Sequence, residues 1–340
     1  MKLATKNTLL LILIFSSLFC AIAMIGLNIL TNSPGQSYKG TLPPGTPEEA
    51  FIRSELQHYV EVLAVEVGER NYEYYDKLNA AADYIEQSLL KTGLSVKRQA
   101  YSIKGSMYYN IEAEKKGLHQ PDTIIIVGAH YDSVHGSPGA NDNGSGIAGV
   151  LSLARTFSTK RPSRSIRFVA FANEEPPFFW TKQMGSYVYA KRCKERKENI
   201  IAMLSLETIG YYSDKEKSQH HFPLLNFFYP SQGNFIAFVS NLSSRKLLRK
   251  VVASFRRNKQ FPSEGGAFPG FFHGIYWSDH WSFWKMGYHA LMVTDTAFLR
   301  YPYYHTAQDT PEKIDFESLS RVVSGLEKVL DDLSGVQETK

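Results

Sequence analysis

The chain has 340 residues, of which 43% are hydrophobic and 21% are charged, and it contains 24 glycines and 15 prolines. These values are typical of a folded globular protein, and they exclude a collagen, a coiled coil, a disordered chain and a polytopic membrane protein. The formal net charge of +5 is mild for this length and comes without a basic tail or stripe, so we expect no nucleic-acid partner.

The N-terminal region contains an uncharged apolar stretch at residues 9–30. As a helix this stretch measures roughly 33 Å, which is enough to span a bilayer. Ala21-Ile22-Ala23 resembles a signal-peptide cleavage site, but apolar residues continue past it to Leu30, further than in a signal peptide. We therefore expect residues 9–30 to be an uncleaved transmembrane signal-anchor.

The charges on either side of the apolar stretch predict its orientation. Residues 1–8 include Lys2 and Lys6, whereas residues 31–38 carry no charge. The positive-inside rule then places residues 1–8 in the cytoplasm and the body outside it, in the periplasm or the extracellular space. Residues 31–45 contain prolines and glycines and are expected to form a linker.

The remaining sequence alternates between strand and helix patterns. Helical spacing of apolar residues predicts helices at 47–67, 74–91, 147–157, 243–257 and 316–330. Apolar or alternating runs predict strands at 95–103, 108–114, 123–127, 166–172, 202–206 and 290–294. This order predicts one α/β domain at residues 46–335, with a mixed, mostly parallel, twisted sheet and helices on both faces. The looser stretch 212–276 is expected to be an insertion that covers a site.

Acidic and imidazole side chains gather after the predicted strands, where ligands bind in α/β sheets. They are His130 after 123–127, Glu174 and Glu175 after 166–172, Glu207 after 202–206, His305 after 290–294, and Asp142 in the loop Gly139–Gly146. Each has an ordinary alternative, such as a buried histidine, a helix cap or a solvated acidic pair. Together they would place several like charges at one edge of the sheet, and a divalent cation would neutralise them.

These motifs also occur together in one known family. The segments His130-Tyr131-Asp132-Ser133, Gly139 to Gly146, Asn173-Glu174-Glu175, Glu207-Thr208-Ile209-Gly210, Ser278-Asp279-His280 and Tyr304-His305-Thr306 resemble, in order and rough spacing, metallopeptidase family 28. This family contains co-catalytic di-zinc aminopeptidases, and it also contains glutaminyl cyclases and inactive receptor-like relatives. The resemblance covers about residues 50–335.

The resemblance implies two zinc ions per chain and a set of ligands for each ion. Asp142 bridges the two ions, His130 and Glu207 complete one site, and Glu175 and His305 complete the other. At the Glu207 position the family more often has Asp. The longer side chain requires a backbone shift or another binding mode, and metal preference could differ.

The same resemblance implies the catalytic roles. Glu174 is the general base that takes a proton from a water and passes it to the leaving amine. Asp132 receives the second N–H of His130 and fixes its tautomer, and Asp279 supports the site in a similar way. Tyr276 is the nearest candidate for a donor to the oxyanion. His135 and His280 lie near these motifs, but we do not assign them as ligands.

The resemblance leads to a membrane-anchored exopeptidase that removes the N-terminal residue of peptides, with peptides and a lipid bilayer as its partners. A glutaminyl cyclase remains an alternative, with an apolar pocket that could use Trp180, Trp277, Trp281 or Trp284. A non-catalytic receptor-like domain is a second alternative. A serine hydrolase lacks its Gly-x-Ser-x-Gly elbow here, and Cys193 lies in a charge run that is expected to face solvent.

Overall fold

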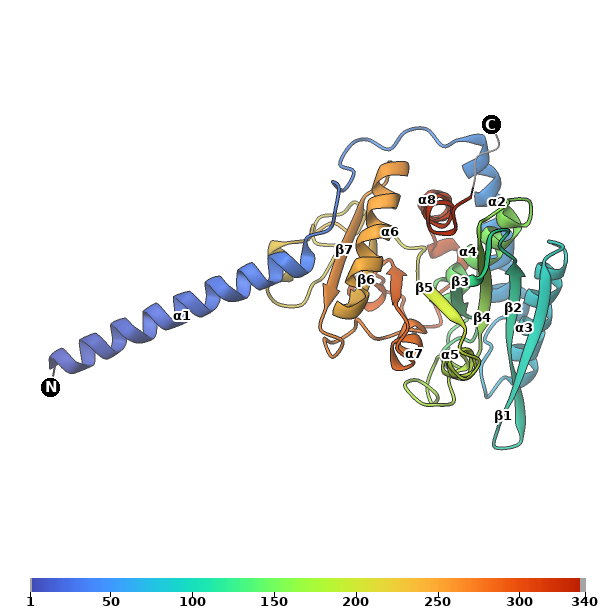
Figure 1. The fold of residues 1–340 in the computed structure, drawn as a ribbon, viewed down its shortest axis with the longest axis horizontal. Coiled ribbons are helices and arrows are strands. Elements are labelled where there is room, and N and C mark those ends of the chain that lie inside the picture. Colours follow the sequence, from blue (N-terminus) through green and yellow to red (C-terminus); the bar gives the residue numbers. More distant parts are fainter. Residues whose placement is uncertain (1, 337–340) are drawn as a thin grey trace.

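Within the described residues, eight strands form one sheet, which Figure 1 shows between two layers of helices. The computed structural model describes residues 2–336, although the side chains of residues 2–7, 9, 19, 20 and 22 lie outside this description. The strands are β1 (Ser95–Ile103), β2 (Ser106–Lys115), β3 (Gln120–His130), β4 (Arg164–Phe171), β5 (Asn199–Glu207), β6 (Ile236–Asn241), β7 (Ser263–Phe268) and β8 (Ala290–Thr294). Their spatial order is β1-β2-β4-β3-β5-β8-β6-β7.

The central strands run parallel, so their carboxyl ends meet at one edge. β3 pairs in parallel with β4 and β5, and β5 pairs in parallel with β8. The register sets His130 opposite Phe171, Gly128 opposite Ser205, and Glu207 opposite Thr294. The antiparallel pairs are β1 with β2, β2 with β4, and β6 with β8. This confirms the predicted mixed, mostly parallel α/β sheet.

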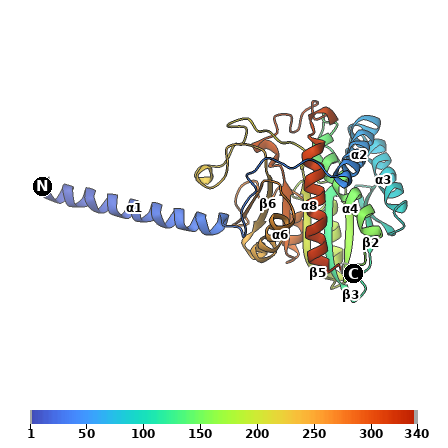
Figure 2. The same ribbon diagram turned by 90° about the horizontal axis from the view of Figure 1, so that it is seen from above.

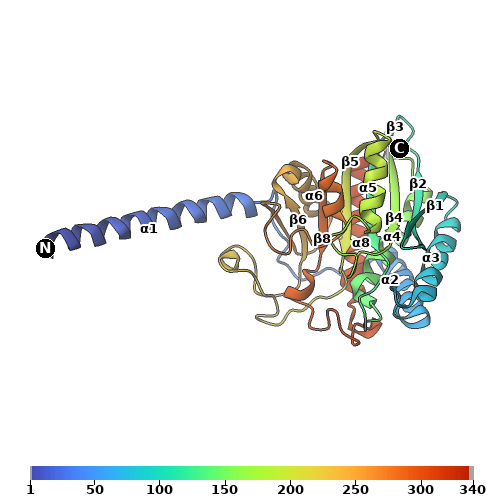
Figure 3. The same cartoon turned by 90° about the horizontal axis from the view of Figure 1, so that it is seen from below.

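Helices cover both faces of the sheet, as the two perpendicular views show (Figure 2, Figure 3). On one face α2, α3, α4, α6 and α8 enclose the larger apolar core. On the other face α5 and α7 pack on a smaller core that includes Phe171, Tyr189 and Phe283. The helices are α1 (Lys2–Thr31), α2 (Pro47–Glu61), α3 (Tyr75–Leu90), α4 (Gly146–Ser158), α5 (Gly185–Glu195), α6 (Arg245–Asn258), α7 (His280–Lys285) and α8 (Phe316–Ser334).

The six strands and four of the helices predicted by periodicity are present. The predicted helical stretch 47–67 is also present, and in it α2 continues into a π-helical turn at Val62–Val67. The sequence analysis does not predict β6 and β7, which join the sheet from within 212–276. β7 reads Ser-Glu-Gly-Gly-Ala-Phe, with almost no apolar alternation. It is nevertheless mostly buried, because α6 packs on its Ser263 and Gly265 face and the chain after α1 runs along it.

Helix α1 leaves the body at the β7 edge of the sheet, opposite the edge formed by β1 and α3 (Figure 1). Its segment Leu10–Thr31 is long and apolar enough to cross a membrane. Residues 32–45 contain no helix or strand, yet they are held against the body. Ser33 Oγ donates to the carbonyl of Gly265 at 2.9 Å, and the Ser263 N–H donates to Ser37 Oγ at 2.9 Å.

Candidate metal centre

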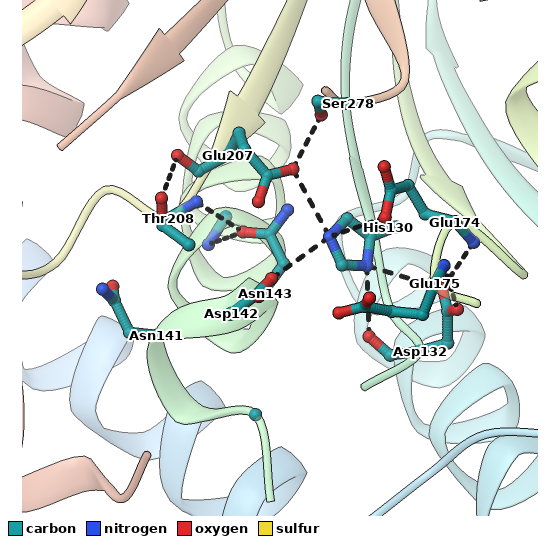
Figure 4. A network of polar contacts seen from close by, with 12 residues as sticks. His130, Asp132, Asn141, Asp142, Asn143, Glu174, Glu175, Glu207, Thr208 and Ser278 are labelled. Atoms are coloured by element: carbon teal, nitrogen blue, oxygen red, sulfur yellow. Dashed lines mark hydrogen bonds and ion pairs between the residues drawn. The ribbon is translucent and has the colours of Figure 1, made fainter. Parts of the chain in front are cut away.

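Six acidic and imidazole side chains converge at the carboxyl edge of the sheet. Figure 4 shows five of them, His130, Asp142, Glu174, Glu175 and Glu207. His130, Asp142 and Glu207 offer three ligand atoms that lie within 4.8 Å of one another. Asp142, Glu175 and His305 form a second set within the same limit, so Asp142 is shared. His130, Glu174 and Glu175 form a third set, which places Glu174 beside both of the others.

His130 is the last residue of β3 and is fully buried. Its Nδ1 lies 3.1 Å from the backbone carbonyl oxygen of Asp132 and 3.5 Å from that residue's carboxylate. A proton on Nδ1 can therefore be donated to the carbonyl, which leaves the lone pair of Nε2 free. Nε2 lies 3.4 Å from oxygens of both Asp142 and Glu207, on the opposite side of the ring.

The Asp132 carboxylate, beside its predicted contact with His130 Nδ1, also binds two backbone N–H groups. Its two oxygens accept the backbone N–H groups of Glu174 at 3.1 Å and Glu175 at 3.0 Å. It therefore fixes the turn after β4 that presents both glutamates, while the carbonyl of the same residue is the closer partner of His130. The sequence pattern places Asp132 beside His130 but cannot distinguish a contact through its carbonyl from one through its carboxylate.

The loop that carries Asp142 is tied to the end of β5 by the two asparagines beside it. Asn143 donates to the carbonyl of Leu206 at 2.8 Å, and its oxygen accepts the N–H groups of Gly146 and Thr208. Asn143 rather than Asp142 thus satisfies the first N–H group of α4. A side chain at Gly146 would lie 2.6 Å from the Leu206 carbonyl oxygen, so only glycine permits this close approach.

Asp309 holds the same loop from the other side, a role the sequence analysis did not find. Its carboxylate accepts the backbone N–H groups of Asn141 at 2.8 Å and Asp142 at 3.0 Å, and also the hydroxyl of Tyr301 at 2.7 Å. Asp309 lies 167 residues after Asp142 and follows no strand. Only the tertiary fold shows that the two are neighbours.

Glu207 and His305 approach the cluster from opposite sides. Ser278 donates to a Glu207 carboxylate oxygen at 2.7 Å and so orients it (Figure 4). His305 Nε2 lies 3.0 Å from Asp142 and 3.4 Å from Glu175. Its ring stacks on Tyr304 with 3.8 Å between the centroids, and 33% of the side chain is exposed. His305 is therefore the member of the cluster that lies nearest to solvent.

The donor set fits divalent cations. Among the residues that the structure describes, buried side-chain atoms without a hydrogen-bond partner include His130 Nε2, Glu175 Oε1 and both carboxylate oxygens of Asp142. Buried polar atoms are rarely left without a partner, and these four belong to the two sets that share Asp142. Imidazole and carboxylate in such groups are the ligands that zinc binds in proteins.

Comparisons with known proteins decide the family. The model of peptidase family M28 matches residues 110–330. The chain is also 36% identical to the uncharacterized Escherichia coli protein YfbL, over 83% of this chain and 88% of that protein. The chain belongs to peptidase family M28.

Other M28-related proteins show what the fold supports elsewhere. The Bacillus subtilis aminopeptidase YwaD is 28% identical, over 61% of this chain and 40% of its own length. A solved zinc aminopeptidase from Bacillus subtilis covers 88% of this chain and 97% of its own, with a TM-score of 0.68 and 17% identity. A Bacteroides thetaiotaomicron glutaminyl cyclase covers 85% and 98%, with a TM-score of 0.61 and 18% identity. The two solved structures, at 17% and 18% identity, show that this chain shares their fold.

Burial and mutual charge shift the ionisation of this M28 centre. Burial raises the pKa of Glu175 to about 7, with Asp142 acting in the same direction, and raises the pKa of Glu174 well above its ordinary value. Burial alone would lower the pKa of His305, but Asp142 and Glu175 outweigh it and raise that pKa to about 11. The pKa of His130 is raised for the same reason, since Glu207, Asp132 and Asp142 outweigh its burial.

Zinc binding should therefore release protons. Without metal the raised pKa values of His130 and His305 keep both imidazoles protonated at neutral pH, whereas a metal ligand must be neutral imidazole. We expect proton release on zinc binding, and an apparent affinity that increases as the pH rises toward the pKa of His305. Calorimetric titration in buffers of different ionisation enthalpy measures this. A binding heat that is independent of the buffer would contradict it.

Arg70 supports the chain between His130 and Asp142, and the sequence analysis did not find it. This fully buried guanidinium lies among the backbone carbonyls of the segment 131–139 and of the turn that follows α2. It donates to the carbonyl oxygens of Tyr131 at 2.6 Å, Pro138 at 2.6 Å, Gly139 at 2.9 Å, Leu63 at 3.1 Å and Gly68 at 3.2 Å. Gly139 itself has φ of 62°, a left-handed conformation that favours glycine.

Replacement of Arg70 should destabilise the whole protein. The substitution Arg70→Met keeps much of the side-chain volume but leaves these buried carbonyls without a donor. We expect the free energy of unfolding to fall by about 3–5 kcal/mol. Urea denaturation of the detergent-solubilised chain measures it, with the exposed Arg161→Met as the matched control. Equal midpoints for the two variants would contradict the role of Arg70.

The other residues singled out in the sequence lie near the cluster but outside its ligand sets. His280 is buried, its Nε2 faces the Ile275 carbonyl at 2.6 Å, and burial lowers its pKa to about 4. His135 is exposed beside Glu73. Asp279 is fully buried and burial raises its pKa to about 7, so it can hold a proton near the cluster.

Cys193 differs from its prediction. The charge run around it was expected to face solvent, but Cys193 is fully buried on α5 against Tyr189 and Phe283. Burial raises the pKa of its thiol to about 12, so it is a poor nucleophile. The error has a simple cause, because Cys193 lies on the inner face of a helix whose outer face carries the charges.

A cavity of about 120 Å³ begins beside Glu207 and Tyr304 and extends between the segment 219–229 and the segment 264–277, which begins in β7. Its walls are mainly apolar and include Phe222, Leu225, Phe238, Phe268, Phe272 and Met292. Of the four tryptophans considered for such a pocket, only Trp277 lines this one, and Tyr276 does not. The M28 centre thus adjoins a small apolar cavity.

Proposed function

We propose that the protein is a membrane-anchored aminopeptidase that holds two zinc ions. Asp142, His130 and Glu207 would hold one ion, and Asp142, Glu175 and His305 would hold the other. The observation that carries this proposal is the shared position of Asp142 between two sets of ligand atoms, each within 4.8 Å. When bound, two such cations polarise a peptide carbonyl and lower the pKa of a water molecule.

Glu174 is the general base in this proposal. It belongs to neither of the two sets that share Asp142, yet its carboxylate lies 3.9 Å from His130 Nε2. Its pKa is raised well above the usual range by burial, so it can accept a proton and hold it until the leaving amine takes it. Asp132 positions Glu174 by accepting its backbone N–H.

The adjoining cavity supports an exopeptidase that prefers a large apolar N-terminal residue. Pockets for drug-sized ligands measure about 300–1,000 Å³, so a cavity of about 120 Å³ admits one side chain rather than several. Its aromatic walls favour an apolar side chain over a charged one. The segments 219–229 and 264–277 line this cavity beside Glu207, which supports a covering role for 212–276 in this proposal.

Membrane anchoring by α1 is part of the same proposal. The segment Leu10–Thr31 is apolar enough to span a bilayer, and none of it is buried against the body in its most apolar part. An exposed apolar helix of this length is typical of a membrane-spanning segment. We place residues 1–8 in the cytoplasm and the catalytic domain outside it.

A set of three peptides tests the proposed reaction. The full chain in detergent, loaded with zinc, is incubated with a peptide that begins with leucine, its N-acetylated form and a peptide that begins with glutamine. We expect mass spectrometry to show loss of leucine from the free peptide and no change in the acetylated one. Internal cleavage, or equal cleavage of the acetylated form, would contradict an aminopeptidase, and loss of ammonia from the glutamine peptide alone would indicate the cyclase.

A further inference from the structure

The end of α1 packs against the loops that cover the cavity. Leu27 and Leu30 of α1 contact a small apolar cluster that contains Leu225, Phe268 and Ile275. These cluster residues also line the cavity beside Glu207. Along the axis of α1, these loops therefore lie at the same height as the last turn of the proposed anchor (Figure 1).

This level is the membrane interface if α1 spans the bilayer. The 22 residues Leu10–Thr31 measure about 33 Å as a helix, slightly more than the hydrocarbon thickness of about 30 Å. The last turn, which contains Leu27 and Leu30, then reaches the boundary between lipid tails and headgroups. Loops that pack around this turn must reach the same boundary.

The loops expose large apolar side chains at this level. Phe271 is 84% exposed, Phe227 is 73% exposed and Leu224 is 47% exposed. All three lie in the loops that hold Leu225 and Phe268. Exposed aromatic side chains are typical of the interfacial region of membrane proteins, where their rings lie among the headgroups.

Positive charge lies beside these apolar side chains. Residues 222–276 contain one acidic residue, Glu264, but seven basic residues, Arg245, Lys246, Arg249, Lys250, Arg256, Arg257 and Lys259. At the start of α6 a surface hollow is lined by Ser243, Arg245, Lys246, Arg249 and His289. Two of these residues reach the anchor, since Arg245 donates to the Ile29 carbonyl and Arg249 to the Asn32 carbonyl, each at 2.8 Å.

We propose that this face, made of Leu224, Phe227, Phe271 and the hollow at the start of α6, rests on the bilayer that α1 spans. The aromatic side chains insert among the headgroups, and the hollow binds the anionic headgroups of phospholipids. The inference rests on the proposed anchoring by α1. Its consequence is that the cavity opens beside the membrane surface, so peptides held at that surface are the substrates with the easiest access.

Site-specific fluorescence of the full chain tests the contact. Cys20→Ser leaves Cys193, which is fully buried, as the remaining native thiol. In this background single cysteines at Phe227→Cys and Phe271→Cys carry an environment-sensitive fluorophore. Leu90→Cys, which is 48% exposed on α3 at the opposite edge of the sheet, is the matched control, and Ile14→Cys reports on the anchor. The protein is reconstituted in vesicles of phosphatidylcholine and phosphatidylglycerol that contain a spin-labelled lipid.

We expect the lipid quencher to reduce the fluorescence at positions 14, 227 and 271 several-fold more than at position 90. Quenching at 14 but only the level of the control at 227 and 271 would overturn the inference and leave the anchor intact. The absence of quenching at 14 would overturn the anchor and the inference together. Neither result depends on peptidase activity, which is measured separately on the soluble leucine peptide.

A charge variant tests the hollow. A basic residue close to an anionic surface contributes roughly a fivefold change in partition. We expect Lys246→Glu to reduce quenching at position 271 in vesicles with phosphatidylglycerol and to have little effect in phosphatidylcholine alone. Lys97→Glu, an exposed lysine on β1, is the matched control. Equal effects of Lys246→Glu and Lys97→Glu would overturn the headgroup site. Dimers in detergent that bury position 271 would indicate that a second copy of the chain, instead of lipid, covers this face.

Discussion

The substitution Glu174→Gln is expected to lower turnover by about 10²–10⁴-fold, the usual contribution of a positioned general base. Gln keeps the size of the side chain and its place after β4, where Asp132 holds the backbone. It cannot accept a proton at neutral pH. Because Glu174 lies outside the two ligand sets that share Asp142, zinc content should stay at the level of the unmodified protein.

Two measurements on one preparation check this result. Initial rates on the leucine peptide give the loss of turnover, and elemental analysis gives zinc per chain. Glu61→Gln, an exposed glutamate at the end of α2, is the matched control and should retain full activity. Retained activity in Glu174→Gln would remove the role assigned to this residue, and loss of zinc with activity would make it a ligand instead.

His305→Ala is expected to remove one zinc ion and nearly all activity. The ring offers Nε2 at 3.0 Å from Asp142 and 3.4 Å from Glu175, so its loss leaves two carboxylates at that position. Changes to outer residues of metal sites already weaken binding by about 10–100-fold, and the loss of a ligand should weaken it by more. Titration with a zinc chelator measures the affinity of the more weakly held zinc ion.

The exposed His135 provides the control for this substitution. His135→Ala removes an imidazole that faces Glu73 at the surface and should change neither zinc content nor rate. Circular dichroism should show that His305→Ala keeps its fold, although the metal-free variant should unfold at a lower urea concentration, because Asp142 and Glu175 lose the protonated ring that faces them. If His305→Ala kept two zinc ions, the assignment of the second site would be wrong.

The sequence predicted the parts of the centre that depend on strand ends. His130, Glu175 and Glu207 follow apolar strands, and in a parallel sheet such positions meet at one edge. β7 was missed because its burial comes from α6 and the segment after α1, which the local pattern does not contain. β6 reads Ile-Ala-Phe-Val-Ser-Asn, so its apolar run was a strand signal that could have been used. A search for alternating apolar and polar residues cannot find a glycine-rich edge strand such as β7, because glycine has no side chain to contribute to the pattern.

The supporting residues were also beyond the reach of sequence patterns. Arg70 and Asp309 act on backbone groups through contacts that join distant parts of the chain, and no local motif distinguishes them from surface charges. Cys193 shows the opposite error, in which neighbouring charges suggested exposure for a residue on the inner face of α5. The family resemblance supplied the ligand set, but the contacts that position it come from the fold.

Anomalous X-ray diffraction at the zinc absorption edge, on crystals of the zinc-loaded protein, tests the proposed centre most directly. The account predicts two peaks about 3.5–4 Å apart, one between His130 and Glu207 and one between Glu175 and His305, with Asp142 in contact with both. A single peak, or no peak between these side chains at saturating zinc, would contradict it.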